Sequence, residues 1–225
     1  MSAAEREEVE AAFRAPAADD PELRARQAAG PYARAGGGLP RAADVTIAAL
    51  ALLVLSPVLA IAVLLIRLDS RGPAFYRQRR VGRGGREFEL LKLRTMSLGS
   101  DPVGVGTAVG SADPRVTRVG RVLRRTSIDE LPNLVNVIRG EMAIVGPRPT
   151  IPSHLEHFAP HQHRRHAVRP GMTGWAQVNG RIGISWGTRI ELDNWYVEHR
   201  SPGLDLRILA RTVLQVLNGK GLDPG

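Results

Sequence analysis

Two adjacent acids, Asp129 and Glu130, lie in the stretch from Asp113 to Pro149 and are the first candidates for catalysis. Neighbouring side chains on a helix point about 100° apart, so these carboxylates cannot act as a facing acid/base pair. They can divide the work, because one can attack a substrate while the other holds a cation. A simpler interpretation stays open. Ser127 and Glu130 match a Ser-x-x-Glu capping box, which predicts a helix that begins at Ser127 and ends at Gly140.

Basic residues precede this acid pair at intervals of three or four positions. On a helix they share one face, and such a face suits phosphate groups. The residues are Arg115, Arg118, Arg121, Arg124 and Arg125. The net charge of +9 calls for an anionic partner, which is nucleic acid, an acidic membrane surface or a phosphorylated substrate. The absence of cysteine excludes disulfides and thiolate metal sites.

The longest apolar run covers residues 45–66 and contains no charge. A straight helix of this length measures about 33 Å, which is enough to cross a bilayer. The Ser56-Pro57 pair lies at its midpoint, where proline frees the carbonyl of Leu53 and bends the helix. We expect the Ser56 hydroxyl to compensate by donating to the carbonyl of Leu52.

Basic residues flank this run on both sides, at Arg41 and at Arg67 and Arg71. This arrangement sets no orientation for a crossing segment and fits both ends on the cytoplasmic face. A re-entrant hairpin, a full span and a buried soluble helix all remain open from the residues alone.

In the segment from 72 to 96, residues of different character alternate on both sides of Arg83-Gly84-Gly85. This alternation around a glycine turn predicts a β-hairpin. Lys92 and Arg94 leave the second strand on the same side, and they either reach a phosphate or form an exposed basic strand face. Residues 97–114 are rich in Gly, Ser and Asp, which predicts a mobile loop near an active site.

Five histidines between residues 151 and 166 are interleaved with arginines, which favours a surface helix over a zinc cluster. Such a helix could also lie against lipid headgroups. Residues 168–181 form a tight irregular segment that ends in Arg181. Residues 204–217 have the period of an amphipathic packing helix.

Three long motifs occur together, GPAFYRQRRVGRGGREFELLKLRTM, SIDELPNLVNVIRGEMAIVGPRP and VRPGMTGWAQVNGR. In order and spacing they resemble the bacterial sugar transferase family, the monotopic polyprenyl-phosphate phosphoglycosyl transferases, from about Arg41 to about Leu222. The resemblance implies transfer of a phospho-sugar from a UDP-sugar to polyprenyl phosphate, with UMP as product. It also implies a re-entrant membrane helix broken at Ser56-Pro57.

The same resemblance assigns roles in the site. Asp129 attacks the β-phosphate through a covalent intermediate, and Glu130, with Asp129, holds Mg²⁺. Phosphate contacts are implied for Lys92, Arg124, Arg148 and Arg181, while Asp193 either supports the site or pairs with an arginine. From the helix N-terminus, Arg124 and the cation, we expect a depressed pKa for Asp129.

We therefore expect an α/β, mainly helical protein with one catalytic domain over residues 41–222, a re-entrant hairpin at 45–66, a small β-hairpin and a flexible extension at 1–40. It would lie on the cytoplasmic face of the bacterial inner membrane and act in glycoconjugate or exopolysaccharide biosynthesis. The expected partners are a UDP-sugar, polyprenyl phosphate and membrane lipid, without nucleic acid. Homo-oligomerisation is left open. The alternative is a non-catalytic basic protein that binds membrane or nucleic acid, for which the apolar run is a poor fit.

Overall fold

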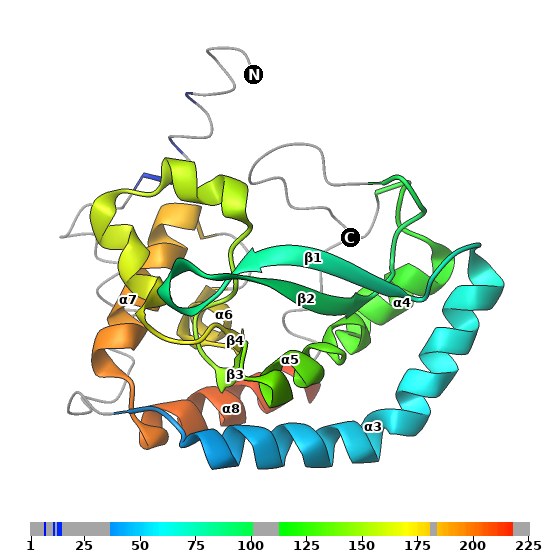
Figure 1. The fold of residues 1–225 in the computed structure, drawn as a ribbon, viewed down its shortest axis with the longest axis horizontal. Helices are drawn as coiled ribbons and strands as arrows, with labels where there is room; N and C mark the ends of the chain where they lie inside the picture. The colour runs from blue at the N-terminus through cyan, green and yellow to red at the C-terminus, as the bar shows by residue number, and fades with distance from the viewer. Residues whose placement is uncertain are drawn as a thin grey trace.

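The computed structural model describes Glu7, Ala11, Phe13, Arg14 and residues 37–100, 113–180 and 184–217. This part of the chain is mainly helical, with two small two-stranded sheets (Figure 1). The helices are α3 (Arg41–Asp69), α4 (Arg118–Thr126), α5 (Asn133–Arg139), α6 (Trp175–Gly180), α7 (Trp186–His199) and α8 (Pro202–Leu217). The 3₁₀ segments are η1 (Arg83–Gly85), η2 (Ile128–Glu130), η3 (Pro152–His157) and η4 (Pro160–Ala167). The strands are β1 (Phe75–Val81), β2 (Glu87–Leu93), β3 (Ala143–Val145) and β4 (Gly171–Thr173).

The apolar run forms most of α3, a single 29-residue helix with Pro57 inside it. Figure 1 shows α3 changing direction part-way along its length. The Ser56 hydroxyl donates to the Leu53 carbonyl at 2.8 Å. The expected acceptor, Leu52, was therefore wrong. Because Pro57 has no amide hydrogen, Leu53 is the carbonyl left without its helical donor, and Ser56 caps it directly.

Large apolar side chains on α3 are exposed along much of its length. They include Leu50, Leu53, Val54, Ile61, Leu64, Leu65 and Leu68. By length and composition α3 could cross a membrane, and few of the residues in its most apolar stretch are buried. A soluble protein rarely exposes so continuous an apolar surface, so this face needs an apolar environment.

The N-terminal end of α3 is fixed to the segment that follows the acid pair. The Arg41 guanidinium donates to the main-chain carbonyl of Val137 at the end of α5. The amide of Ile144 in β3 donates to the Asp44 carboxylate at 3.0 Å. Since both Asp44 and Ile144 are buried, this contact anchors the start of α3 inside the domain.

The C-terminal end of α3 is fixed to the same domain. The amide of Val119 in α4 donates to Asp69 at 3.1 Å. Arg94 donates to the carbonyls of Ser70 and Arg71 at 2.9 Å and 2.7 Å. Arg94 is thus buried and bonded to the main chain, so neither alternative, a phosphate contact or an exposed basic strand face, holds for this residue.

The predicted β-hairpin is confirmed. Strands β1 and β2 pair antiparallel from Phe75 opposite Leu93 to Val81 opposite Glu87. The turn places Gly84 at φ 67° and Gly85 at φ 78°, a left-handed conformation that glycine adopts without a Cβ penalty.

The capping box predicted at Ser127 was wrong. Ser127 has φ 57° and ends α4, where its amide donates to the carbonyl of Arg124. A 3₁₀ turn, η2, carries the acid pair, and α5 begins only at Asn133. The local pattern misled because the Glu130 side chain bonds residues of β2 and the loop after β3 instead of the Ser127 amide. The predicted end at Gly140 is confirmed by its left-handed φ of 89°.

The main core lies between α5, β3, α6, α7 and α8, around Trp175, Leu192, Leu204 and Ile208. The expected amphipathic helix is confirmed as α8, whose Leu204 and Ile208 are fully buried while Leu206 is exposed.

The histidine-rich segment folds as η3 and η4 and not as one surface helix. His154 and Arg165 are buried, because this segment packs on α7. Phe13 from the N-terminal region inserts here, with its ring 5.1 Å from the ring of His154 and 5.5 Å from that of Trp186. The sequence pattern gave no signal for this contact.

Candidate active site

Glu130 is held by two cations from distant parts of the chain. Lys92 of β2 donates to its Oε1 at 2.8 Å, and Arg148 donates to the same oxygen at 2.6 Å. A second Arg148 nitrogen reaches Oε2 at 3.4 Å. Burial alone would raise the pKa of Glu130, but the attraction of Arg148 and Lys92 outweighs it and holds this pKa well below the usual range. Glu130 is therefore ionised at neutral pH.

Asp129 lies beside this ion cluster. The residue is 9% exposed, and its carboxylate is hydrogen-bonded to none of the described residues. Burial raises its pKa to about 6, against the opposing attraction of Lys92, Arg148 and Arg124. The expected depressed pKa was wrong, because removal from water outweighs the nearby cations. At pH 7 the group is still mostly ionised, so a charged carboxylate lies beside the ion cluster.

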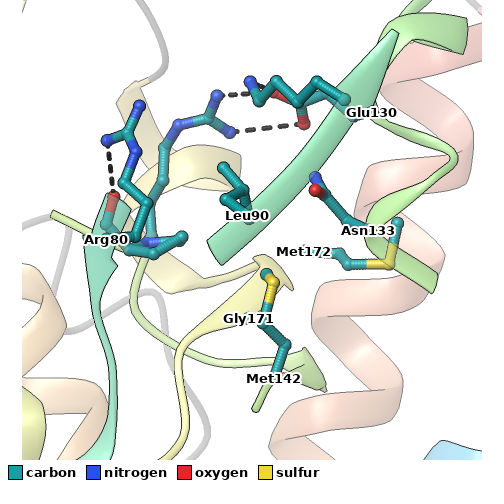
Figure 2. Close-up of a pocket in the computed structure, with 10 residues that line it drawn as sticks. Arg80, Leu90, Glu130, Asn133, Met142, Gly171 and Met172 are labelled. Carbon is teal, nitrogen blue, oxygen red and sulfur yellow. Dashed lines mark hydrogen bonds and ion pairs between the residues drawn. The ribbon is translucent and has the colours of Figure 1, made fainter. Parts of the chain in front are cut away.

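Below the ion cluster the surface is hollowed, and Figure 2 shows the side chains around this hollow. Its rim carries Arg80, Lys92, Glu130 and Arg148, and its lower wall carries Leu90, Asn133, Met142 and Met172 with Gly171. We call this space the Glu130 hollow. Gly171 is required there, since a Cβ would lie 2.1 Å from the main chain of Gly146.

Arg80 adds a third cation to the rim. Its guanidinium donates to the carbonyl of Pro149 at 2.9 Å and to the Gln78 side chain at 2.6 Å. Burial and the neighbouring Arg148 lower its pKa to about 10, so it stays charged at neutral pH. Within the described residues Arg80 has no carboxylate within ion-pair distance, and the rim thus carries more positive than negative charge.

A buried ion pair between Arg165 and Asp193 holds the main chain of Arg148 in place. Arg165 donates to the Asp193 carboxylate at 2.6 Å, to the Arg148 carbonyl at 2.7 Å and to the Thr150 hydroxyl. Asp193 therefore supports the site through Arg165 and does not line the hollow itself. The sequence singled out Asp193 but missed Arg165, whose one signal was its place in a basic run.

Comparison with known proteins gives the family. The model of bacterial sugar transferases matches residues 37–219. The chain is a bacterial sugar transferase. It is 43% identical over 184 residues to an uncharacterised sugar transferase, EpsL, from Bacillus subtilis, covering 82% of this chain and 90% of that protein.

Several relatives have named activities, and two of them illustrate the match. The chain is 45% identical over 203 residues to a UDP-glucose:undecaprenyl-phosphate glucose-1-phosphate transferase from Caulobacter vibrioides, covering 82% of this chain and 74% of the relative. It is 42% identical over 185 residues to a protein of the same name from Escherichia coli, covering 79% of this chain and 40% of that relative. The chain thus matches less than half the length of the relative from Escherichia coli.

The structure brings most of the expected transferase residues together. Asp129, Glu130, Lys92 and Arg148 form one cluster, and Arg124 is close enough to lower the pKa of Asp129. Arg181 lies outside the described residues, as does most of the expected loop at 97–114. Sequence reasoning missed Arg80 as a site residue. Arg77 and Arg79 of β1 are exposed and pair with Glu89 and Glu87, whereas Arg80 comes directly after them and lies on the opposite, less exposed face of the strand.

The Mg²⁺ that the resemblance implies can be tested against these residues. Asp129 has no hydrogen-bond donor among the described residues, and Glu130 Oε2 has only the 3.4 Å contact from Arg148. These oxygens fit a hard cation. The described part of the chain holds no group of three acids or histidines, so the remaining ligands would have to come from a diphosphate and water.

Proposed function

We propose that this transferase moves a phospho-sugar from a UDP-sugar to a polyprenyl phosphate at the membrane surface. The observation that carries this proposal is the free, buried carboxylate of Asp129 beside Glu130, with Lys92, Arg148 and Arg80 around them. A site with several cations and one free nucleophile is suited to an anionic, electrophilic substrate such as a diphosphate. The names of the relatives support the same pair of substrates.

The reaction has two balanced steps. A carboxylate oxygen of Asp129 attacks the β-phosphorus of the UDP-sugar, the bond from that phosphorus to the bridging oxygen breaks, and UMP leaves with the bridging oxygen. An oxygen of polyprenyl phosphate then attacks the same phosphorus, and the Asp129 carboxylate is released. Neither step needs a general base to remove a proton, because both attacking groups are anions.

The surrounding cations have distinct tasks. Arg148 and Lys92 hold Glu130 and face the phosphates, and Arg80 supplies charge without a carboxylate to neutralise it. Mg²⁺ held by Glu130 and Asp129 with the diphosphate would supply further neutralisation of the leaving UMP. Preorganised positive groups of this kind stabilise charge that develops on transferred phosphate.

The membrane placement is also a proposal. We infer that α3 enters and leaves the same leaflet of the inner membrane from the cytoplasmic side. Both of its ends are bonded to the catalytic domain, Arg41 to Val137 and Asp69 to Val119. A straight span would place those ends about 30 Å apart on opposite sides of the bilayer. The bend at Pro57 lets the exposed apolar face enter lipid while both ends stay in contact with the domain.

One experiment tests the reaction and its intermediate. The purified protein in lipid is given a panel of UDP-sugars with and without polyprenyl phosphate, and UMP release is followed. We expect UMP to appear before the acceptor is added, up to about one per enzyme, with the phospho-sugar found on Asp129 by mass spectrometry. An unmodified Asp129 in an enzyme that turns over only with both substrates bound would exclude the covalent route.

A further inference from the structure

Asn133 at the start of α5 lies in the wall of the Glu130 hollow and is 3% exposed. Its side-chain oxygen is buried and has no hydrogen-bond partner in the described part of the chain. In Figure 2 its carboxamide points from α5 toward the space between Glu130 and Leu90. A buried oxygen without a partner costs about 1–3 kcal/mol, and a ligand that donates a hydrogen bond to it would recover that cost.

Asn136, one turn later on the same helix, shows what a structural asparagine looks like here. It is equally buried, and its oxygen accepts from the Leu91 amide at 3.0 Å. Its nitrogen donates to the Glu89 carbonyl and to the Glu141 carboxylate, both at 2.7 Å. Both ends of the Asn136 amide are thus used to join α5 to β2. Asn133 makes none of these bonds, so fixing α5 does not explain it.

The surroundings of Asn133 limit what it can bind. Leu90, Met142 and Met172 line the same hollow with apolar groups, and Arg80, Lys92 and Arg148 line it with cations. A phosphate placed against those cations would bring its attached group close to Asn133. A carboxamide offers one acceptor and two donors, and it is suited to a neutral group that presents both a donor and an acceptor.

We propose that Asn133 is a specificity-determining residue that hydrogen-bonds a neutral polar group of the UDP-sugar. This inference rests on the proposed function and deepens it. Two parts of the substrate carry the required chemistry, the edge of the uracil ring and the hydroxyl or amide groups of the transferred sugar. A site whose buried polar group is left unpaired by the wrong ligand discriminates strongly against that ligand.

The test uses the full-length protein in lipid with Asn133→Ala and Asn133→Asp. The first removes the carboxamide, and the second keeps its size but removes the donor. Binding of UMP is measured by calorimetry, and kcat/KM is measured for each UDP-sugar of the panel. We expect each variant to lose about tenfold in UMP affinity or in kcat/KM, which corresponds to about 1.4 kcal/mol. A loss for UMP assigns the contact to uracil, and a loss confined to UDP-sugars with a changed order of sugars assigns it to the sugar.

A stability measurement separates this role from a structural one. Asn133→Ala should keep or raise Tm, because it removes an unpaired buried amide, whereas Asn136→Ala should lower Tm by breaking three bonds. Wild-type affinity for UMP and wild-type kcat/KM with every UDP-sugar in both Asn133 variants would overturn the proposal. If the wild-type protein itself turns over no UDP-sugar, the proposed function fails instead, and the two failures are distinct.

Discussion

The guanidinium of Arg165 and the carboxylate of Asp193 lie 2.6 Å apart, and each side chain is only 1% exposed. Burial raises the pKa of Asp193 to about 6 even though Arg165 and Arg189 oppose the shift. The pair is therefore costly to bury. What it provides is position, since Arg165 also holds the carbonyl of Arg148, whose side chain grips Glu130.

Arg165→Met should destabilise the protein by about 3–5 kcal/mol, because it leaves Asp193 buried without its partner. The double change of Arg165→Met with Asp193→Leu should recover most of that loss, since an apolar pair can replace a buried ion pair. Chemical unfolding of both variants measures this. The kcat should stay low in the double variant, because the Arg148 carbonyl still lacks its donor. If the double variant is as unstable as the sum of the two single changes, Arg165 and Asp193 are not energetically coupled.

Turnover should fall as pH drops below about 6. In the proposed reaction Asp129 must be ionised to attack. Burial raises its pKa to about 6, and the adjacent Glu130 adds to this shift, while Lys92, Arg148 and Arg124 oppose it. The acid limb of kcat/KM against pH, measured with a saturating acceptor, reports this group in the free enzyme. Lys92→Met removes the strongest opposing charge and should move the limb to higher pH. A limb near pH 4 in the wild type would contradict the burial argument.

Asp129→Asn should abolish turnover and stabilise the fold at neutral pH. A carboxyl whose pKa is raised from 3.8 to about 6 binds its proton more tightly in the folded state. Its contribution to stability therefore falls as pH rises from about 4 to about 6. Above that range the charged group costs up to ~3 kcal/mol. Thermal unfolding at pH 7.5 and pH 4 should show a higher Tm for the variant only at pH 7.5. If the variant and the parent protein have equal Tm values at both pH values, the charged Asp129 carboxylate does not lower stability.

Pro57→Leu should drive α3 toward a full span, because it restores a helical hydrogen bond and removes a penalty of roughly 3 kcal/mol. The chain has no cysteine, so single thiols report topology directly. Gly37→Cys precedes α3 and Gly203→Cys begins α8, and a side chain at either position meets nothing within 4 Å. Both should be labelled from the cytoplasmic side in the parent protein.

With Pro57→Leu, labelling at position 37 should fall while position 203 stays accessible as the control. The contact of Arg41 with α5 holds the start of α3 against the domain. Adding Arg41→Gln to Pro57→Leu should therefore lower the labelling at position 37 further. If position 37 stays cytoplasmic in all of these variants, proline does not set the topology.

Chelation should stop turnover if the proposed Mg²⁺ takes part, because a bound diphosphate together with Asp129 and Glu130 would bring more negative charge than Arg80, Lys92 and Arg148 neutralise. Glu130→Gln should raise the Mg²⁺ concentration needed for half-maximal rate. The Mg²⁺ titration of both proteins measures this, with Glu141→Gln as a control at an acid that lies just after the end of α5 and outside the Glu130 hollow. Full activity in excess EDTA would remove the metal from the mechanism.

Elements governed by local chemistry could be predicted from the sequence. The hairpin follows from alternation around Gly84 and Gly85, and α5 ends at Gly140 because glycine adopts the left-handed conformation readily. The apolar run gave α3, and the family motifs gave Lys92, Asp129, Glu130 and Arg148 as one site.

Features decided by tertiary contacts could not be predicted. Ser127 fits a capping box by spacing, but Glu130 finds stronger cationic partners from β2 and the loop after β3. The pKa of Asp129 depends on how completely the folded chain excludes water, which no local pattern records. Arg80 and Arg165 look like ordinary basic residues until their surroundings are known.

The bonds at both ends of α3 bear on how this protein responds to lipid. A helix that crosses a bilayer must match its hydrocarbon thickness by tilting or by deforming the lipid. A helix that enters and leaves one leaflet has no second interface to match. In the proposed re-entrant arrangement, the depth of α3 would be set by its contacts with the catalytic domain at Arg41 and Asp69. Bilayers of short and long acyl chains should therefore seat the active site at the same height and support the same rate.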